Sequence, residues 1–209
     1  GRSTLNECLV NDKVEEVLVV NRRELGISHP KLKELIHSDF TDFSKIADEF
    51  SGFDACFHCM GVTSVGKSEA EFTTFTFDIT KSLADACHSA NPEMVFNYVS
   101  GTGTDSSEQG ETMWARVKGK TETYVLNKGF NDAYMFRLGA LIPEGEVSSG
   151  ASWYKYIYIL MKPLNPLLKK IKSVTTSSKF GKAMINSVSA NQDLKHLEGV
   201  DINQLAGND

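Results

Sequence analysis

Three side chains suited to chemistry stand close together in the middle of the chain, within residues 94–118, MVFNYVSGTGTDSSEQGETMWARVK. An apolar run at 94–99 predicts a buried strand, and Ser100 follows it directly. A small, flexible turn and a polar stretch then lead into a predicted helix that carries Trp114 and Lys118. Because these two are four residues apart, they share one helix face. A strand that ends in Ser, followed by a helix that returns a Lys over it, is how a nucleotide-binding α/β sheet builds a site at the carboxyl ends of its strands.

This segment resembles the active-site segment of the short-chain dehydrogenase/reductase superfamily, in its atypical NmrA-like and epimerase-like branch. In that superfamily a Ser at the strand end and a Tyr-x-x-x-Lys on the next helix form the catalytic group. Ser100 and Lys118 match this pattern, whereas Trp114 stands at the Tyr position. The resemblance covers about residues 1–188, and it makes Ser100, Trp114 and Lys118 the candidate catalytic positions.

The Trp at the Tyr position limits the chemistry that the resemblance implies. In the family the Tyr hydroxyl relays a proton, the Lys lowers the pKa of that hydroxyl and holds the nicotinamide ribose, and the Ser steadies the substrate carbonyl. An indole N–H donates a hydrogen bond but does not exchange a proton usefully near neutral pH. General acid–base catalysis typically contributes about 10²- to 10⁴-fold to the rate. Cofactor binding through Ser100 and Lys118 can survive this change.

Other groups near Ser100 could replace the missing acid. Tyr98 precedes it by two residues and faces the same side of the predicted strand. Carboxylates also lie on the loop between the strand and the helix; they are Asp105, Glu108 and Glu111. Each of these residues fits an ordinary surface or core role at least as well as a catalytic one.

Composition narrows the class of protein. The 209 residues fit one domain, or one domain with a small appendage. We divide them into an NAD(P)-binding Rossmann domain at 1–140 and a C-terminal substrate-side segment at 141–209 that packs on the same domain. A formal net charge of −5 gives no reason to expect nucleic acid. No apolar stretch reaches the roughly 18 residues that span a bilayer, so we expect no membrane partner. Four cysteines suit a reducing cytoplasm.

Cys56 and Cys59 form a C-x-x-C pair within a predicted strand at 53–60. Positions three apart on a strand face opposite sides of the sheet, so a redox or zinc site is not expected. We interpret both cysteines as buried core residues, and we expect no metal site. His58, on the same strand, is also expected to be buried and hydrogen-bonded.

The order of elements implies that the sheet lacks its opening strand. A short helix around Leu5 and Cys8 precedes the first strand at 14–20, whereas the superfamily begins with a strand and a G-x-x-G-x-x-G turn. Gly1 resembles the last glycine of that turn. We therefore expect about one strand and its turn, roughly a dozen residues, to be missing before Gly1.

The end of the strand at 14–20 carries Asn21, Arg22 and Arg23. An acidic residue there binds the ribose 2′-hydroxyl of NAD, whereas Arg accommodates the 2′-phosphate of NADP. The sequence therefore favours NADP over NAD, with two solvated arginines as the alternative. Asp39 resembles the family residue that contacts adenine, and it fits a turn or helix cap equally well. Gly61 resembles the turn at which the backbone approaches the cofactor closely. The candidate cofactor-binding residues are Gly1, Asn21, Arg22, Arg23, Asp39, Phe40, Gly61 and Lys118.

Strands separated by helices along the chain predict an α/β fold, a doubly wound parallel sheet that is Rossmann-like. The expected strands lie at 14–20, 35–37, 53–60, 94–99 and 132–138, and the expected helices include 42–50, 68–91, the helix of Trp114, and 180–188. Aromatic residues crowd into 153–161, where they could line a substrate pocket, form a dimer or cap the sheet.

Two functions fit this sequence. The first is an NADP-dependent reductase, or a sugar-nucleotide epimerase-like enzyme, that uses Ser100, Lys118 and an unidentified acid on a small-molecule substrate. The second is a non-catalytic NADP(H)-sensing regulator of the NmrA-like type, which the Trp substitution favours. A homodimer is compatible with both. A chain without its phosphate loop could also bind nothing.

Overall fold

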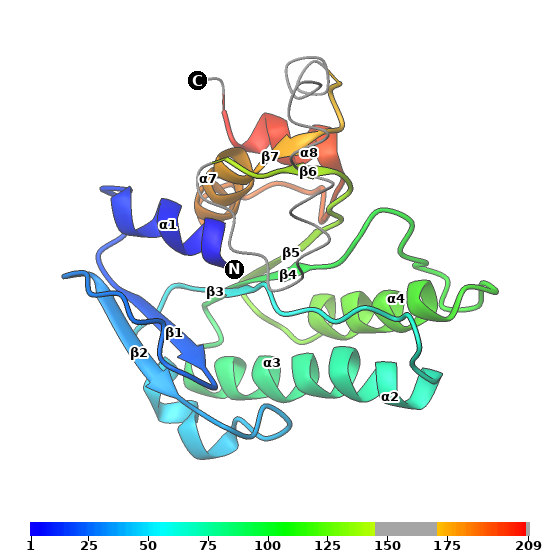
Figure 1. The fold of residues 1–209 in the computed structure, drawn as a ribbon, viewed down its shortest axis with the longest axis horizontal. Helices are drawn as coiled ribbons and strands as arrows, with labels where there is room; N and C mark the ends of the chain where they lie inside the picture. The colour runs from blue at the N-terminus through cyan, green and yellow to red at the C-terminus, as the bar shows by residue number, and fades with distance from the viewer. Residues whose placement is uncertain (145–170, 208–209) are drawn as a thin grey trace.

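A computed structural model describes residues 1–144 and 171–207. Its strands are all parallel and form three groups, which Figure 1 shows near the centre, at one side and at the top of the molecule. The central sheet has the order β3-β4-β5-β8. These strands are β3 (Ala55–His58), β4 (Val95–Val99), β5 (Asp132–Phe136) and β8 (His196–Leu197). Two parallel pairs accompany it, β1 (Val17–Asn21) with β2 (Leu32–Ile36) and β6 (Leu141–Ile142) with β7 (Thr175–Thr176).

Helices cover both faces of the central sheet, which confirms the predicted doubly wound α/β fold (Figure 1). One face carries α2 (Glu69–Thr73), α3 (Ile79–Ala90) and α4 (Met113–Leu126). The other face carries α1 (Arg2–Val10), α7 (Ser177–Ser187) and α8 (Gly199–Leu205). A 3-10 helix, Ser44–Phe50, stands where a helix was expected at 42–50.

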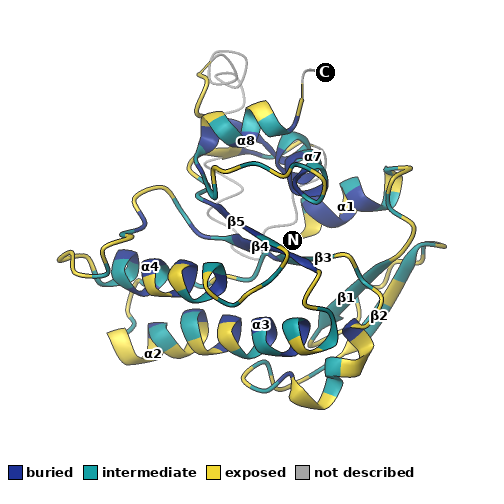
Figure 2. Ribbon diagram, turned by 180° about the vertical axis from the view of Figure 1, so that it is seen from behind, coloured by how far each residue is buried: buried dark blue, intermediate teal, exposed yellow. Residues whose placement is uncertain are grey.

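Alternate side chains of each central strand pack into two hydrophobic cores, one on each face of the sheet. In β4, Phe96 packs into the cluster beneath α3 and α4, whereas Val95 packs into the cluster around α7. Asn97 also faces α7, where its side-chain amide donates to the Met184 carbonyl at 3.3 Å. Figure 2 shows the resulting buried, dark-blue strands between helices whose outer sides are exposed. The strand is buried on both faces, as a continuous apolar run predicts.

The predicted sheet is not continuous. Within residues 1–144 and 171–207, no backbone ladder joins β1 to β3. Strands belong to one sheet when backbone hydrogen bonds link them. No described strand provides that link between β1 and β3. The two sheets nevertheless share a core, because Leu18 and Val20 of β1 pack against the cluster that contains Phe96.

Several elements differ from their predicted bounds. The strand expected at 35–37 starts earlier, at Leu32. The helix expected at 68–91 contains a π-helical segment, Thr74–Asp78. The final predicted helix starts earlier, at Ser177, where Thr176 Oγ1 accepts from the Lys179 N–H and caps the helix.

The tail after Asn191 was not predicted to be ordered, and it forms β8 and α8. Leu197 and Ile202 are fully buried, and β8 extends the sheet by pairing with β5. Glu198 opens α8 with a capping box that includes Asp201. The tail therefore belongs to the domain core.

The two cysteines of the C-x-x-C pair face opposite sides of the sheet, as predicted. Cys56 packs with the cluster beneath α3, and Cys59 packs with the cluster around α7, where its Sγ lies 3.9 Å from Met184 Sδ. His58 is buried and lies 3.0 Å from Thr80 Oγ1. The aromatic residues at 153–161 fall outside the described residues. No described helix combines the length and apolar character needed to cross a membrane.

Candidate functional site

The candidate site begins where β4 and β5 end. Val99 pairs with Phe136 in the parallel ladder, so Ser100 and Arg137 are the next residues on neighbouring strands. The Ser100 N–H donates to the Phe136 carbonyl at 2.9 Å, which fixes this step. Strand alternation turns both Ser100 and Arg137 toward α4.

Both side chains donate hydrogen bonds to a buried carboxylate on α4, that of Glu122. Ser100 Oγ donates to Glu122 Oε1 at 2.5 Å. Arg137 donates from Nε to Oε1 at 3.1 Å and from Nη2 to Oε2 at 2.5 Å, a bidentate ion pair. Only 1% of Glu122 is exposed. The sequence analysis missed Glu122, although a signal existed: it follows Lys118 by four residues and so shares the helix face of Trp114 and Lys118.

Residues from the C-terminal tail and the 101–112 loop close this cluster. His196 Nε2 lies 3.4 Å from Glu122 Oε2. Glu198 Oε1 lies 3.9 Å from Arg137 Nη1. Arg137 Nη2 donates to Ser106 Oγ at 2.5 Å. We call the set Ser100, Glu122, Arg137, Ser106, His196 and Glu198 the Glu122 cluster.

Lys118 lies beside the turn that follows Ser100. A Cβ atom placed on Gly101 would be 3.7 Å from Lys118 Nζ. Burial lowers the pKa of the Lys118 ammonium, and the charge of Glu122 acts in the opposite direction. The ammonium therefore lies at the carboxyl end of β4, beside Gly101, the residue after Ser100.

The indole of Trp114 packs on the same turn. A Cβ atom placed on Gly103 would be 3.4 Å from Trp114 Cη2. Gly103 has a φ of 86°, a conformation that L-residues with side chains rarely adopt. Trp114 therefore covers the glycine turn one helical turn before Lys118.

The groups considered as replacement acids have other roles. Tyr98 is 2% exposed and hydrogen-bonded to Thr121, and burial raises its pKa, so its hydroxyl is not placed to donate a proton to a ligand. Asp105 accepts from the Ser107 hydroxyl and from the Gly110 N–H, and these bonds lower the pKa of its carboxyl. Glu108 and Glu111 are on the loop, where Glu111 is exposed and Glu108 is half-buried.

Close packing of that loop on α4 depends on one glycine. A Cβ atom on Gly119 would lie 1.8 Å from the Asp105 carbonyl oxygen. The Asp105 N–H in turn donates to the Ala115 carbonyl at 3.1 Å. These contacts position Ser106 against Arg137.

Gly1 lies at the same edge of the sheet. It is the N-cap of α1, and a Cβ atom on it would lie 3.6 Å from Cys59 Cβ, just beyond β3. The first turn of α1 thus starts near the carboxyl end of the sheet, and a helix N-terminus attracts anions. Gly61 has open space around its Cα, because a Cβ atom placed on it would have no heavy atom within 4 Å.

Asn21 is the last residue of β1, and Arg22 and Arg23 follow it. The Arg22 guanidinium carbon lies 5.9 Å from the centroid of the Phe40 ring, which brings together two candidate cofactor-binding residues. Arg22 and Arg23 are exposed. An acidic residue missed by the sequence analysis lies nearby: Glu34 Oε2 accepts from the Leu25 N–H at 2.9 Å.

Asp39 takes the role of a turn residue. Its Oδ1 accepts from the N–H and the hydroxyl of Thr41, at 3.0 and 2.6 Å. These hydrogen bonds lower the pKa of the Asp39 carboxyl. This geometry matches the turn alternative, and it leaves the second carboxylate oxygen for other partners.

Comparison with known sequences places this arrangement in a family. A sequence model described as "NAD dependent epimerase/dehydratase family" matches residues 1–140, which is more than half of the chain. The chain belongs to the NAD dependent epimerase/dehydratase family.

One curated relative of this family member is Protein HTATIP2 of Rattus norvegicus. The two are 26% identical over 156 residues, which is 73% of this chain and 63% of the relative. The chain thus spans less than two thirds of the length of this relative.

Solved structures share the fold at low sequence identity. WbmH of Bordetella bronchiseptica, solved in complex with NAD+, has a TM-score of 0.66 at 15% identity, over 99% of this chain and 75% of WbmH. UDP-N-acetylglucosamine 4-epimerase of Bacillus cereus has a TM-score of 0.62 at 13% identity, over 94% of this chain and 72% of the epimerase. These values establish a Rossmann-like fold for this family member.

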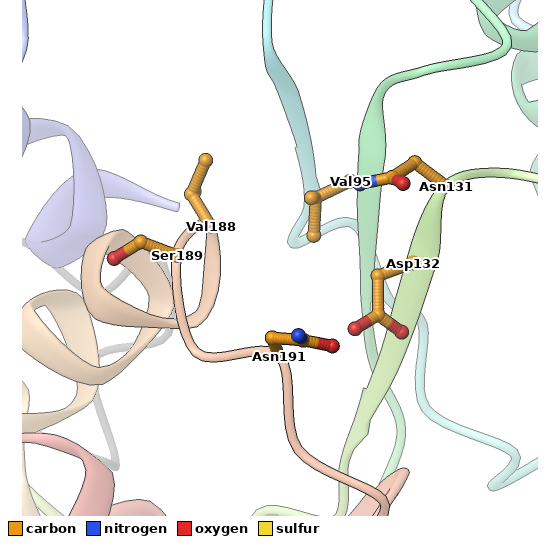
Figure 3. A pocket seen from close by; sticks show the side chains of 6 residues that line it. All are labelled: Val95, Asn131, Asp132, Val188, Ser189 and Asn191. Atoms are coloured by element: carbon orange, nitrogen blue, oxygen red, sulfur yellow. The ribbon is translucent and has the colours of Figure 1, made fainter.

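A polar hollow of about 280 Å³ lies at the opposite end of the sheet. Figure 3 shows it between the starts of β4 and β5 and the turn after α7. It is lined by Val95, Asn131, Asp132, Val188, Ser189 and Asn191. Because this hollow is at the amino ends of the strands, it is separate from the candidate site of this epimerase/dehydratase family member.

Proposed function

We propose that this chain is an NADP-binding member of its family, a reductase or epimerase-like protein in which Trp114 replaces the catalytic Tyr. The observation that carries the proposal is the position of Lys118 Nζ beside the Ser100–Gly101 turn. A Lys in this place can donate hydrogen bonds to the ribose hydroxyls of a dinucleotide that lies along the carboxyl edge of the sheet.

The N-terminus of α1 and the arginines after β1 support the cofactor assignment. The first turn of α1 can receive a phosphate through its N–H groups. Arg22 stands over Phe40 and is exposed, so it can meet a 2′-phosphate next to adenine. This arrangement favours NADP over NAD. The four cysteines are free thiols, which fits the proposed location in a reducing cytoplasm.

The nicotinamide ring of NADP supplies hydride transfer. The residues of this chain would bind and orient the dinucleotide and cover the turn beside it. Lys118 holds the ribose, and Trp114 covers the turn and offers an indole N–H as a hydrogen-bond donor. Because indole does not exchange a proton near neutral pH, the acid for a carbonyl substrate must come from the substrate, from water or from another residue.

Titration calorimetry with NADPH and NADH tests cofactor binding. We expect NADPH to bind more tightly than NADH, and equal affinities or no binding would contradict the assignment. A second assay follows NADPH oxidation with aldehydes, quinones and nucleotide-linked sugars as small-molecule substrates. Turnover supports the enzyme, and a rate that is unchanged in Trp114→Phe would show that the indole takes no part.

A non-catalytic NADP(H) sensor is the second candidate. The packing of Trp114 on Gly103 favours it, because the indole fills the place of the proton-relay group. Tight NADPH binding without turnover on any substrate would support this function. Gel filtration with and without NADPH would then report a ligand-dependent change of oligomeric state, including the expected homodimer.

A further inference from the structure

The hydroxyl of Ser100 points its hydrogen toward the buried carboxylate of Glu122. A serine hydroxyl has one hydrogen to donate, and in this structure it lies 2.5 Å from a carboxylate oxygen of Glu122. A bond of this length to an ionised acceptor is among the stronger side-chain hydrogen bonds. The lone pairs of Ser100 Oγ are therefore the part of the hydroxyl left for a ligand. This differs from the role implied by the resemblance, in which the Ser donates to a carbonyl.

We propose that Glu122 is a positioning residue: its buried carboxylate fixes Ser100 as a hydrogen-bond acceptor and, one turn away on α4, supports the positive charge of Lys118 beside the Ser100–Gly101 turn, where a dinucleotide would bind. The proposal rests on the proposed function, since it assigns Lys118 to cofactor binding. Glu122 itself is 1% exposed, so it does not contact a ligand directly.

Groups from three elements surround the Glu122 carboxylate. Arg137 contributes a bidentate ion pair from the end of β5, and His196 approaches from β8 at 3.4 Å. On the same helix, Lys118 is one turn away. Tyr98, on β4, is the neutral titratable group that Glu122 also faces.

Arg137 has its own acidic neighbours. Glu198 approaches from the start of α8 at 3.9 Å, and the charge of Asp105 on the loop also raises the pKa of Arg137. The arginine is thus shared among three carboxylates, of which Glu122 holds the bidentate contact. This ties the orientation of Ser100 to the C-terminal tail as well as to α4.

Two opposing influences act on Lys118. Burial disfavours its charge, and Glu122 is the carboxylate that supports it. Neutralising Glu122 should therefore release the Lys118 proton at a lower pH. Neutral lysine donates weaker hydrogen bonds than ammonium, because charge-assisted hydrogen bonds contribute more.

The experiment compares the full chain with Glu122→Gln, which preserves the shape of the side chain and removes its charge. NADPH affinity is measured by calorimetry at pH 7 and pH 9. We expect the variant to match the parent within about twofold at pH 7 and to bind about tenfold more weakly at pH 9, the loss that a charged hydrogen bond typically carries. A merely structural role would weaken binding equally at both pH values, and that result would overturn the proposal.

Two variants serve as controls. Glu69→Gln makes the same change in the exposed pair with Arg116 and should leave the pH dependence as it is. Lys118→Arg fixes the positive charge, so adding Glu122→Gln to it should produce no extra loss at pH 9. If Glu122→Gln does not fold, the double variant Glu122→Gln with Arg137→Gln removes both buried charges and keeps the same expectation.

A direct titration separates this inference from the proposed function. NMR of lysine labelled with ¹³C at Cε reports the titration midpoint of Lys118, assigned by the signal lost in Lys118→Arg. A lower midpoint in Glu122→Gln supports the coupling, and an unchanged midpoint refutes it. Absence of NADPH and NADH binding by the parent protein would instead refute the proposed function, and the NMR result would still decide the role of Glu122.

Discussion

The two ends of the candidate site are built in contrasting ways. Beneath α4, Ser100 and Glu122 are buried and joined by hydrogen bonds to Arg137. At the ends of β1 and β2, Arg22 and Arg23 are exposed, and the strand that presents them is partly buried throughout. One end is set before any ligand arrives, whereas the other offers side chains that a ligand would have to order.

This difference follows from where each end lies in the fold. The Glu122 cluster lies among β4, β5, β8 and α4, where strand alternation and helix packing determine each side-chain direction. β1 and β2 form a sheet of two strands, and no other described strand pairs with either of them. A preorganised end contributes to rate or affinity through geometry, and exposed charged side chains contribute through selectivity among ligands.

The largest expected effect comes from breaking the buried ion pair. Arg137→Met leaves the Glu122 carboxylate buried without its bidentate partner, and removing one partner of a buried pair typically costs about 3–5 kcal/mol of unfolding free energy. Urea denaturation measures this loss. Lys33→Met, which breaks the exposed pair with Glu16, is the matched control and should cost less than about 1 kcal/mol. Equal effects would mean that the Glu122 cluster is no more preorganised than the surface.

The next largest effect is a pH dependence of the unfolding free energy, and it comes from the buried histidine on β3, His58. Thr80 Oγ1 donates to the Thr76 carbonyl at 2.5 Å, so His58 Nε2–H donates to Thr80 Oγ1. Burial lowers the pKa of His58 to about 4.

The unfolded chain binds this proton near pH 6.5, so it holds more protons than the folded chain between pH 6.5 and about 4. Stability therefore falls as the pH drops through that window, by up to about 3 kcal/mol. His58→Gln, which can still donate to Thr80, should lose this part of the pH dependence. If the two urea-unfolding profiles run parallel between pH 7 and pH 4, the histidine is not buried in its neutral form.

Overpacking beneath the loop should have a smaller effect. Gly119→Ala places a methyl group 1.8 Å from the Asp105 carbonyl oxygen, and such changes typically cost about 1–3 kcal/mol. The loop must move, so Ser106 should also leave Arg137 and NADPH affinity should fall. Gly61→Ala is the control for stability, because its methyl group would meet no atom within 4 Å. An unchanged melting temperature in Gly119→Ala would show that the loop is not fixed on α4.

The sequence predicted the parts of this molecule that depend on local pattern. The apolar run of β4, the helix of Trp114 and Lys118, and the parallel arrangement all follow from hydrophobic periodicity and the alternation of strands with helices. Ser100 and Lys118 could be placed near each other because a strand end and the next helix are neighbours in such a fold.

Other parts depend on contacts between distant segments. A Glu in the middle of a helix usually faces solvent, and only the approach of Arg137 from β5 makes burial of Glu122 possible. The tail residues His196 and Glu198 lie in a polar stretch with weak periodicity, and pairing with β5 orders them. Such tertiary effects override local propensity.

The smallest expected change in stability, and the sharpest test of the exposed end, comes from Arg22. Its guanidinium is exposed and lies over Phe40, so Arg22→Gln should alter the free energy of unfolding by less than about 0.5 kcal/mol. A charged hydrogen bond to a 2′-phosphate is worth about 1.5–3 kcal/mol, so NADPH affinity should fall roughly tenfold or more. NADH lacks that phosphate, and its affinity should stay within about twofold.

Arg23→Gln carries the same charge change one residue further along the chain. Arg23 has no ring contact in the described structure comparable with that between Arg22 and Phe40, so we expect a weaker effect on NADPH than at Arg22. A larger loss in Arg23→Gln would move the phosphate contact to Arg23. Equal losses of NADPH and NADH in both variants would show that the arginines act through general charge, because only a contact with the 2′-phosphate distinguishes the two dinucleotides.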